Sequence, residues 1–290
     1  MTPEISVIIS TYNSVAWLEK VLLSYKYQTY KNFEIVIADD GSGFDTENLI
    51  NYFKERTSLN ITHIWHEDDG FQKSKILNKA ITACKSEYIL MSDGDCIIRT
   101  DFLVQHIKFR KKGHFLSGGY FKLPKDISEN ISEKDIKYQN CFDIDWLTYQ
   151  GLKKSFKNNK LTATGTKAKL LNIFTTTKAT WNGHNASGWK KDIILVNGMD
   201  ERMQYGGQDR ELGERLVNAG IKPIQIRYNA ICVHLHHERS YAKAESIALN
   251  RKIRNYTKKH KVISTPYGIN KLLPKENIKE EVEKKLIYQI

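Results

Sequence analysis

The 290-residue sequence has little of what usually marks a metal-stapled, disulfide-linked or membrane-spanning protein. No apolar run reaches the roughly 18 residues that a membrane-spanning helix requires. The few cysteines are widely spaced and form no C-x-x-C pair, which argues against a zinc site and against a disulfide framework. We therefore expect four reduced thiols, at Cys84, Cys96, Cys141 and Cys232.

The chain also lacks the features of a secreted protein. Met1-Thr2-Pro3-Glu4 leads into an apolar strand instead of a signal peptide. At 40% hydrophobic and 27% charged residues, the composition is typical of a globular protein with a substantial core. We expect a cytoplasmic protein.

Charge is the one unbalanced quantity. Lysine and arginine number 45 against 33 aspartates and glutamates, a formal net charge of +12. A basic surface attracts nucleic acid, anionic lipid or a polyanionic substrate. Residues 251–285 combine basic with apolar side chains, which allows two interpretations. They form either a solvated helical face or a tail that makes peripheral contact with the anionic inner membrane.

Short apolar runs alternate with helical patterns over the first hundred residues. Residues 5–9 and 33–38 are typical of buried strands, and residues 17–22 carry helical spacing. A second helical pattern over 75–81 precedes an apolar strand over 88–91. This order predicts an α/β fold with a Rossmann-like, mostly parallel central sheet, right-handed crossovers and flanking helices.

The second half of the chain is less regular. Residues 111–178 are rich in Lys, Asn, Ser and Thr, and we expect loops and short helices there. A helix over 209–219 and a strand over 224–227 follow. The predicted organisation is one domain over 1–241, with a nucleotide-binding half (1–110) and a catalytic, acceptor-binding half (111–241), then a basic C-terminal helical extension over 242–290.

Two aspartates follow the strand predicted over 88–91. Asp93 and Asp95 flank Gly94 at the end of a buried strand, where α/β proteins keep their ligand sites. Two carboxylates at a glycine bend can hold a divalent cation with one side chain and face the sugar of a nucleotide with the other. A Mg²⁺ or Mn²⁺ ion there would neutralise a leaving diphosphate. An ordinary Asp-Gly turn is the alternative for the motif on its own.

Polar residues at the other strand ends could complete a nucleotide site. Ser10 and Tyr12 could contact a base or ribose, although a strand-to-helix turn explains them as well. Asp40 could accept a hydrogen bond from a uracil N–H or a ribose hydroxyl, or it could serve only the turn Asp39-Asp40-Gly41-Ser42. Lys75 is the candidate cation near the diphosphate, with a solvated lysine on an amphipathic helix as the alternative.

A further cluster, Tyr205-Gly206-Gly207-Gln208-Asp209, precedes the helix predicted over 209–219. Two glycines permit close backbone approach, so Gly207 is a candidate contact to the donor. An aspartate is ionised at neutral pH and can take a proton from an attacking sugar hydroxyl. Asp209 is therefore a candidate general base, with helix capping as the alternative.

Three histidines follow an apolar strand, in Cys232-Val233-His234-Leu235-His236-His237. Imidazoles beside two carboxylates would complete a manganese site. Strand alternation places His234 and His236 on one face and His237 on the other, so we do not expect all three to point inward. The pattern leaves open which histidine binds metal, and purely structural histidines are the alternative.

In their order along the chain, these motifs resemble a known family. The runs 6–13, 39–42 and 93–95 resemble the motifs of family 2 glycosyltransferases, which have the GT-A fold. Phe71-Gln72-Lys73-Ser74-Lys75-Ile76-Leu77-Asn78 is similar to the F-N-R-A-K-L-L-N motif of β1,4-galactosyltransferases, and residues 205–209 are similar to their W-G-G-E-D motif. This C-terminal segment also resembles bacterial chondroitin-type polymerases.

The resemblance implies inverting transfer from a UDP-sugar. In the matching motifs, Asp95 is the metal ligand, His234 is its histidine partner, Asp209 is the base and Phe71 is among the donor contacts. The run 182–187 matches the place of a donor-sugar loop.

Two residues depart from the family pattern. Gln208 replaces a glutamate that contacts the acceptor sugar, and Tyr205 replaces a tryptophan that packs against substrate. The resemblance therefore does not identify the acceptor.

We expect a Mn²⁺- or Mg²⁺-dependent hexosyltransferase of EC class 2.4. It would move a hexose or N-acetylhexosamine from a UDP-sugar to a hydroxyl of an oligosaccharide or glycolipid acceptor, in lipopolysaccharide or capsule biosynthesis. One alternative is a sugar nucleotidyltransferase, although residues 10–14 do not form its glycine-rich phosphate loop. The other is a non-catalytic sugar- or RNA-binding protein. RNA binding would need aromatic and basic residues on a sheet face, and the strands here are aliphatic, so we expect no nucleic-acid partner.

Overall fold

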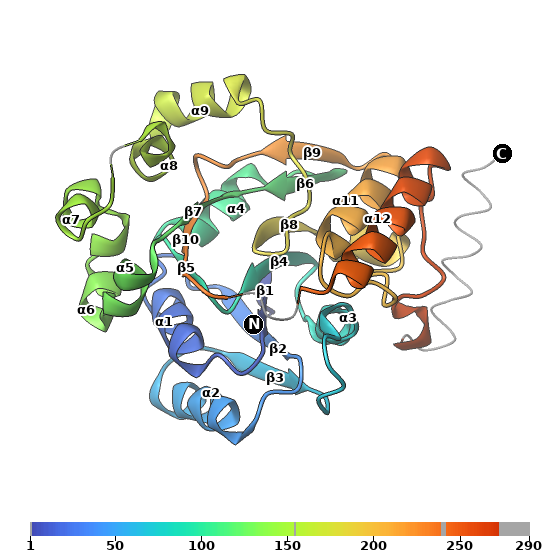
Figure 1. Ribbon diagram of the computed structural model, residues 1–290, viewed down its shortest axis with the longest axis horizontal. Helices are drawn as coiled ribbons and strands as arrows, with labels where there is room; N and C mark the ends of the chain where they lie inside the picture. Colours follow the sequence, from blue (N-terminus) through green and yellow to red (C-terminus); the bar gives the residue numbers. More distant parts are fainter. Residues whose placement is uncertain (1, 154, 239–241, 273–290) are drawn as a thin grey trace.

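The strands of the chain form two sheets. A computed structural model describes residues 2–153, 155–238 and 242–272. The strands in these residues are β1 Ile5–Thr11, β2 Phe33–Asp39, β3 Ile61–Trp65, β4 Tyr88–Asp93, β5 Cys96–Ile98, β6 His114–Ser117, β7 Gly119–Lys122, β8 Asn185–Trp189, β9 Lys222–Gln225 and β10 Ile231–His234. The larger sheet has the order β3-β2-β1-β4-β8-β6-β9, and the smaller has the order β5-β10-β7 (Figure 1).

Helices cover both faces of the larger sheet. The helices of the described residues are α1 Val15–Lys26, α2 Phe44–Arg56, α3 Lys73–Ala83, α4 Phe102–Phe109, α5 Lys125–Asn130, α6 Glu133–Lys137, α7 Ile144–Tyr149, α8 Asn159–Thr162, α9 Gly165–Phe174, α10 Lys190–Leu195, α11 Gln208–Asn218 and α12 Ala244–Lys259, with 3-10 turns η1 Asn140–Phe142, η2 Phe156–Asn158 and η3 Ile269–Leu272. In Figure 1, α5 to α9 form an arm on one side of the sheets, and α11 and α12 lie together on the other.

The central strand β1 shows why both faces must be covered. All seven of its residues are buried. Side chains alternate between the two faces of a strand, so Val7 packs into the apolar cluster that includes α1, α2 and α4, whereas Ile8 packs into the cluster that includes α3, α10 and α11. A strand that is buried on both faces carries a continuous apolar run, and this run made β1 predictable.

The predicted α/β fold with a mostly parallel central sheet is confirmed. Strands β3, β2, β1 and β4 are parallel neighbours, and β6 is parallel to β9. The sheet is mixed because β8 runs antiparallel to both β4 and β6. Strands β3, β5, β6, β7 and β8 were not predicted, and β8 begins within the run 182–187 that was expected to be a donor-sugar loop. They are short, and β6 and β7 lie within the segment 111–178, where only loops and short helices were expected.

The chain passes from the larger sheet to the smaller one at Asp93-Gly94-Asp95. The Gly94 N–H donates a hydrogen bond of 2.8 Å to the carbonyl oxygen of Ser10, at the end of β1. A Cβ at Gly94 would lie only 3.0 Å from that oxygen, so glycine permits this close approach. Strand β5 begins one residue after Asp95 and pairs with β10, with Cys96 opposite His234. This register brings His234 beside Asp95.

The buried side-chain amide of Asn185 forms a second connection between the two sheets. Asn185, the first residue of β8, is fully buried, and its Nδ2 donates to the carbonyl oxygens of Gly119 (2.7 Å) and Ala230 (3.0 Å). Its Oδ1 lies 3.0 Å from His106 Nε2 on α4. Burial lowers the pKa of His106 to about 3, so the imidazole is neutral and its Nε2–H donates to the amide oxygen.

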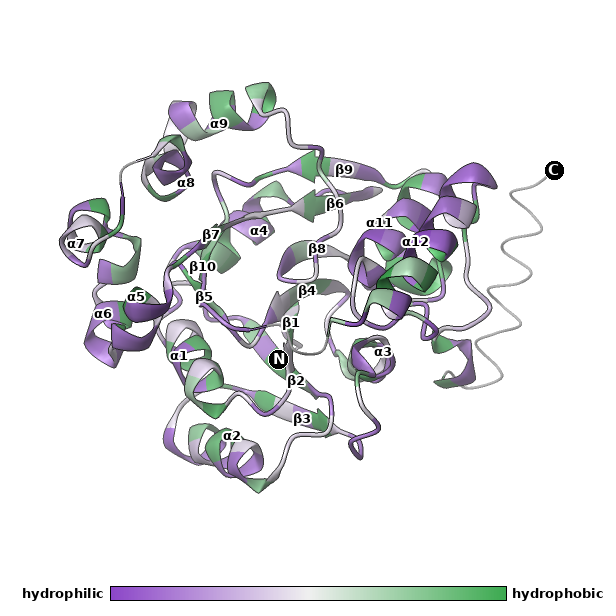
Figure 2. Ribbon diagram, viewed as in Figure 1, coloured by the Kyte–Doolittle hydropathy of each residue, from purple (hydrophilic) through white to green (hydrophobic). Residues whose placement is uncertain are grey.

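The segment after residue 241 packs onto the rest of the chain. Helix α12 lies along α11, where Thr257 Oγ1 donates to Glu211 Oε1 at 2.8 Å and Arg254 forms an ion pair with Glu214. Figure 2 colours α12 as mainly hydrophilic, in keeping with its basic sequence. The part of the predicted extension and membrane-contacting tail over 273–290 lies outside the described residues. Among the helices that the structure describes, none combines the length and apolar character that a membrane crossing demands.

Candidate functional site

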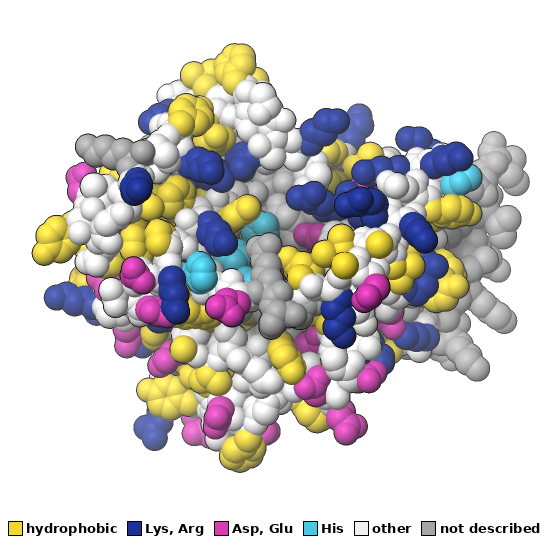
Figure 3. Space-filling view, viewed as in Figure 1, with side chains coloured by type: hydrophobic (Ala, Val, Ile, Leu, Met, Phe, Trp, Pro, Cys, Tyr) yellow, Lys and Arg dark blue, Asp and Glu magenta, His cyan; other side chains and the backbone are white. Residues whose placement is uncertain are grey.

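A cleft of about 1160 Å³ opens at the carboxyl ends of β1 and β4. Loops before α3 and α11, the segment after β10, and α12 complete its walls. Figure 3 shows this face, with histidines on one side of the central hollow and lysine and arginine side chains gathered on the other, over α11 and α12. The predicted site residues that line the cleft are Ser10, Tyr12, Asp40, Phe71, Asp93, Asp95, Gly207, Asp209 and His234.

Asp93 is held as an ionised carboxylate by a cation that was not predicted. It accepts hydrogen bonds from Ser10 Oγ and from Lys73 Nζ, both at 2.7 Å. Burial disfavours the charge on Asp93, but the positive charge and hydrogen bond of Lys73, together with the hydrogen bond from Ser10 and the influence of His184, hold the pKa of Asp93 well below its ordinary range. Burial would likewise lower the pKa of Lys73, yet Asp93 keeps that pKa above its ordinary value. The two side chains therefore form an ion pair at the floor of the cleft.

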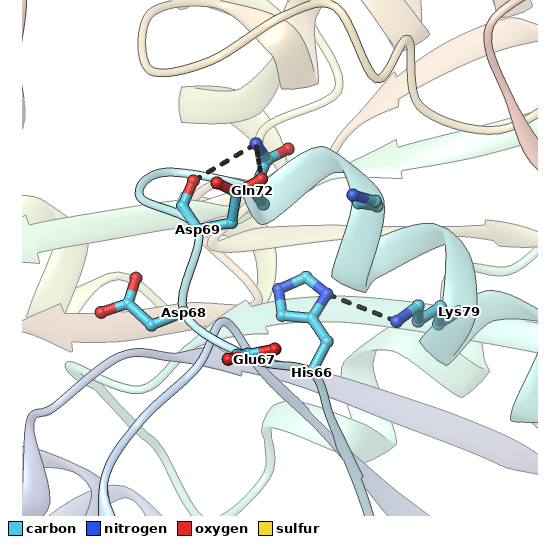
Figure 4. A pocket seen from close by; sticks show the side chains of 7 residues that line it. His66, Glu67, Asp68, Asp69, Gln72 and Lys79 are labelled. Carbon is cyan, nitrogen blue, oxygen red and sulfur yellow. Dashed lines mark hydrogen bonds between the residues drawn. The ribbon is translucent and has the colours of Figure 1, made fainter.

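The structure does not place Lys75 in the cleft. Lys75 lines a smaller, neighbouring pocket of about 450 Å³. Figure 4 shows this pocket with the acidic residues Glu67, Asp68 and Asp69 of the loop before α3. Two residues apart on a helix of about 3.6 residues per turn, Lys73 and Lys75 project in directions roughly 200° apart. The F-N-R-A-K-L-L-N motif has a cation at both of these positions. The signal for Lys73 was therefore present, and only the orientation of the helix decides which lysine faces the cleft.

Asp40 is fixed at the edge of the cleft by two partners. His66 Nε2 lies 2.8 Å from Asp40 Oδ1, and the backbone N–H of Gln72 donates to Asp40 Oδ2 at 3.0 Å. Burial raises the pKa of Asp40 above its ordinary value. A carboxylate offers about four acceptor sites, so Asp40 retains the capacity to accept a hydrogen bond from a ligand. Tyr12 lies near it and donates from its hydroxyl to Asp68 Oδ2 at 2.8 Å.

Asp95, His234 and His237 form a cluster that could hold a metal ion. Asp95 Oδ2 lies 3.7 Å from His234 Nε2 and 3.1 Å from His237 Nε2. One ligand atom from each of the three residues lies within 4.8 Å of the others. Burial opposes the charge on Asp95, but a hydrogen bond from His237 and the charge of His234 lower the pKa of its carboxyl below the ordinary value.

The orientation of the two imidazoles supports a metal site. His234 Nδ1 lies 2.8 Å from the carbonyl oxygen of Leu235, and His237 Nδ1 lies 2.8 Å from that of Glu238. A carbonyl only accepts, so each Nδ1 carries a hydrogen, and the Nε2 atom of each ring faces Asp95. A metal ion between the three residues would take the place of the protons that otherwise bridge Nε2 and the carboxylate. One carboxylate and two imidazoles suit a divalent transition metal such as Mn²⁺, so the residues fit the predicted ion.

The expectation that His237 would point away from His234 was wrong. Strand β10 ends at His234, so strand alternation does not continue to His237. The chain has no regular secondary structure over residues 235–238, and His237 lies beside Asp95. His236 lies outside the cluster, and its backbone N–H donates to Ser128 Oγ at 3.0 Å.

Asp209 lies in the first turn of α11. The N-cap is Gly207, which has a positive φ of 91°, and Gly206 has a φ of 116°. Both values lie in the region that favours glycine, which gives a conformational reason for the pair. Asp209 Oδ2 accepts from the Gly183 N–H at 3.0 Å, and Oδ1 accepts from the Arg210 N–H at 2.8 Å. Both oxygens retain acceptor capacity, and the helix N-terminus stabilises the negative charge.

His184 is a further residue of the cleft that was not singled out. It belongs to the segment 182–187, and its ring lies 4.6 Å from the Tyr120 ring and 6.4 Å from the His234 ring between centroids. Burial lowers the pKa of His184 to about 4, so its imidazole is neutral at pH 7 and can donate or accept a hydrogen bond. Its place beside the metal cluster suits a contact with a bound ligand.

The comparison with sequence families identifies the chain. It belongs to glycosyl transferase family 2, whose sequence profile matches residues 6–169. The chondroitin synthase of Escherichia coli is 26% identical over 74% of the chain, which spans 32% of that protein. An uncharacterized glycosyltransferase of Rickettsia felis is 31% identical over 39% of the chain, and the chain spans only 18% of its length. The chain therefore spans about a fifth to a third of these curated relatives.

Solved structures confirm the fold. TarS 1–349 of S. aureus, in complex with UDP-GlcNAc, aligns with a TM-score of 0.58 at 15% identity over 90% of the chain and 70% of its own length. The mannosyltransferase PcManGT of Pyrobaculum calidifontis, in complex with GDP-Man and Mn²⁺, aligns with a TM-score of 0.56 at 20% identity over 83% of the chain and 59% of its own length. The predicted GT-A fold is confirmed by these neighbours.

The metal cluster makes a direct prediction for His237. His237→Ala should weaken Mn²⁺ binding by roughly tenfold or more, because one of three protein ligands is lost. Isothermal titration of the metal-free chain with Mn²⁺ measures the effect. His236→Ala is the matched control, because His236 is adjacent but lies outside the cluster, and it should keep the wild-type affinity. Equal affinities of the wild type and His237→Ala would exclude His237 as a ligand.

Proposed function

We propose that this protein is a metal-dependent, inverting glycosyltransferase. It transfers a hexose or N-acetylhexosamine from a UDP-sugar to a hydroxyl group of a glycan acceptor. The observation that carries the proposal is the meeting, in one cleft, of an ionised Asp93, a metal-binding cluster around Asp95, and Asp209 at a helix start. Membership of family 2 supports the reaction class.

The nucleoside would lie along the ends of β1 and β2. Asp40, which is held by His66 and Gln72, presents carboxylate oxygens to an N–H of the base, and uracil offers one such group. Tyr12 and Phe71 line the same part of the cleft and offer aromatic surface. The complex of TarS with UDP-GlcNAc supports a UDP-sugar donor.

Asp95, His234 and His237 would hold Mn²⁺ or Mg²⁺. When bound, the ion supplies positive charge that stabilises the leaving diphosphate. Two imidazole ligands favour Mn²⁺, since Mg²⁺ prefers oxygen ligands. The Mn²⁺ in the PcManGT complex supports the same choice.

The ammonium group of Lys73 adds a second positive charge near the proposed position of the diphosphate. Its ammonium group has three donors, of which one is engaged by Asp93 at 2.7 Å. The others can donate to diphosphate oxygens. Asp93 then keeps the lysine charged and oriented, in addition to facing the ribose or sugar of the donor.

Asp209 would act as the general base. The acceptor hydroxyl oxygen forms a bond to the anomeric carbon, the bond from that carbon to the diphosphate oxygen breaks, and a carboxylate oxygen of Asp209 takes the hydroxyl proton. The Gly183 and Arg210 N–H groups fix the orientation of the carboxylate. Because attack comes from the side opposite to the diphosphate, an α-linked donor yields a β-glycoside.

The proposed acceptor is an oligosaccharide or glycolipid of lipopolysaccharide or capsule biosynthesis. The likeness to chondroitin synthase and the net charge of +12 support this class of substrate. The galactosyltransferase-like character of the C-terminal segment, the cytoplasmic location and the contact of the tail with an anionic membrane stay predictions. Strands β1 and β2 are buried throughout, so they present no open sheet face to RNA.

Asp209→Asn tests the base directly. The amide cannot take the proton, so the rate of UDP release from the donor should fall by roughly 10²- to 10⁴-fold, while the affinity for UDP should be unchanged. A coupled UDP-release assay and isothermal titration with UDP measure the two quantities. Asp145→Asn, an exposed site on α7, is the control and should match the wild type. Wild-type turnover by Asp209→Asn would contradict the mechanism.

The two lysines of α3 form a second matched pair. Lys73→Gln should weaken UDP binding in the presence of Mn²⁺ by about tenfold, or ~1.4 kcal/mol, because a charge facing the diphosphate is lost. Lys75→Gln should stay within about twofold of the wild type, a difference of ~0.4 kcal/mol, because Lys75 faces the smaller pocket. The thermal unfolding temperature of Lys73→Gln, compared with that of the wild type, checks that the loss of the ion pair with Asp93 does not unfold the chain. A loss confined to Lys75→Gln would reverse the assignment.

A further inference from the structure

One wall of the cleft is a basic stripe, which consists of Lys243, Arg251 and Arg254 with Ile247 among them. Lys243 is the N-cap of α12, and the others follow on the helix. Their spacing of four, four and three residues places them on one helical face. All four line the cleft, so this face of α12 is turned toward its interior. Figure 3 shows the corresponding gathering of lysine and arginine over α11 and α12.

The basic stripe is docked on the turn that leads to Asp209. A Cβ at Gly207 would lie 3.1 Å from Arg254 Nη1, and a Cβ at Gly206 would lie 3.2 Å from Ile247 Cγ1. Asn250, on the same helix, donates to the carbonyl oxygens of Gln204 (2.9 Å) and Tyr205 (3.1 Å). These contacts hold the stripe beside the start of α11, where the proposed base lies.

Most of this positive charge has no acidic partner in the part of the chain that the structure describes. Arg254 is compensated by Glu214, whose Oε1 lies 2.5 Å from Arg254 Nη2. Within the described ranges, Lys243, Arg251 and the nearby Arg210 form no ion pair. All three side chains are exposed to solvent at the cleft. Glu238, which also lines the cleft, offsets only part of their charge.

The place of the stripe indicates which substrate it meets. The diphosphate would lie at the metal cluster and Lys73, at the ends of β4 and β10. In a single displacement, the acceptor hydroxyl approaches from the side opposite to the diphosphate, and the base that takes its proton lies on that side. The wall next to Asp209, across the hollow from the histidines in Figure 3, therefore faces the acceptor.

We propose that the acceptor is an anionic glycan, with a carboxylate or phosphate group within one or two sugar residues of the hydroxyl that is glycosylated. Arg251 and Arg210 can each donate two parallel hydrogen bonds to such a group, and Lys243 adds a further charge. The proposal rests on the proposed function and names the substrate class of the same site. It also gives part of the chain's excess positive charge a specific task.

The test is binding of the full chain, with UDP and Mn²⁺, to an array of matched glycans. One pair is a hexuronate-containing oligosaccharide and its carboxyl-reduced form. The other is a phosphorylated oligosaccharide and its dephosphorylated form. The wild type should bind the anionic member of at least one pair about tenfold or more tightly, and the pair that shows the difference identifies the anionic group. Preference for the neutral members, or no preference in either pair, would overturn the proposal.

Two double variants distinguish binding of the anionic group at a specific subsite from general attraction between opposite charges. Lys243→Gln combined with Arg251→Gln should remove most of the preference for anionic glycans. Lys252→Gln combined with Lys259→Gln makes the same change in charge on exposed parts of α12 that do not line the cleft, and it should keep the preference. An equal loss in both double variants would contradict a specific subsite.

A separate titration with UDP distinguishes failure of this inference from failure of the proposed function. The affinity of Lys243→Gln combined with Arg251→Gln for UDP and Mn²⁺ should equal that of the wild type. If UDP affinity falls tenfold or more, the stripe binds the diphosphate and the inference is wrong, while the transferase function stands. If the wild type itself does not bind UDP, the proposed function fails.

Discussion

The bend at Asp93-Gly94-Asp95 is the constraint on which the cleft depends. It is the point where the chain leaves one sheet and enters the other, and it is held against β1 by the hydrogen bond from Gly94 to Ser10. Asp93 faces Lys73 on one side of the bend, and Asp95 faces the histidines on the other. A single turn therefore separates the carboxylate that is neutralised by lysine from the carboxylate that is available to a metal.

The smaller sheet places the histidines beside the bend. Strand β10 pairs with both β5 and β7, which fixes His234 opposite Cys96 and next to Asp95. Asn185 ties the larger sheet to the backbone beside β7 and β10 through two buried hydrogen bonds. Buried, satisfied amides of this kind hold their partners in one arrangement. The distance between Asp95 and the imidazoles is thus set by backbone pairing as well as by the side chains themselves.

The predicted site residues that the structure brings into one cleft share a physical reason for being there. Ser10, Asp40, Asp93 and Asp95 follow apolar runs, and parallel strands bring their carboxyl ends to one edge of the sheet. For such residues, the local sequence pattern is sufficient to predict a position at this edge of the sheet. It is also sufficient for Asp209, because the glycines before it mark the start of a helix.

The residues that were missed depend on geometry beyond the local pattern. Whether Lys73 or Lys75 faces the cleft is set by how α3 packs on the sheet. The approach of His237 to Asp95 is set by the irregular segment that follows a strand of only four residues. The placement of Arg251 depends on the packing of α12 on α11, between segments that are far apart in sequence. No periodicity in the sequence reports contacts of this kind.

The resulting cleft has two walls of different character, one with carboxylate and imidazole side chains and one with the basic side chains of α12. The most direct test of its assignment is nucleotide release from a panel of UDP-, GDP-, CMP- and dTDP-sugars by the full chain, with Mn²⁺ and with EDTA. The account predicts slow release of UDP from one UDP-sugar, supported by Mn²⁺ and abolished by EDTA. Release that is equally fast in EDTA, or that occurs only from a donor other than a UDP-sugar, would contradict it.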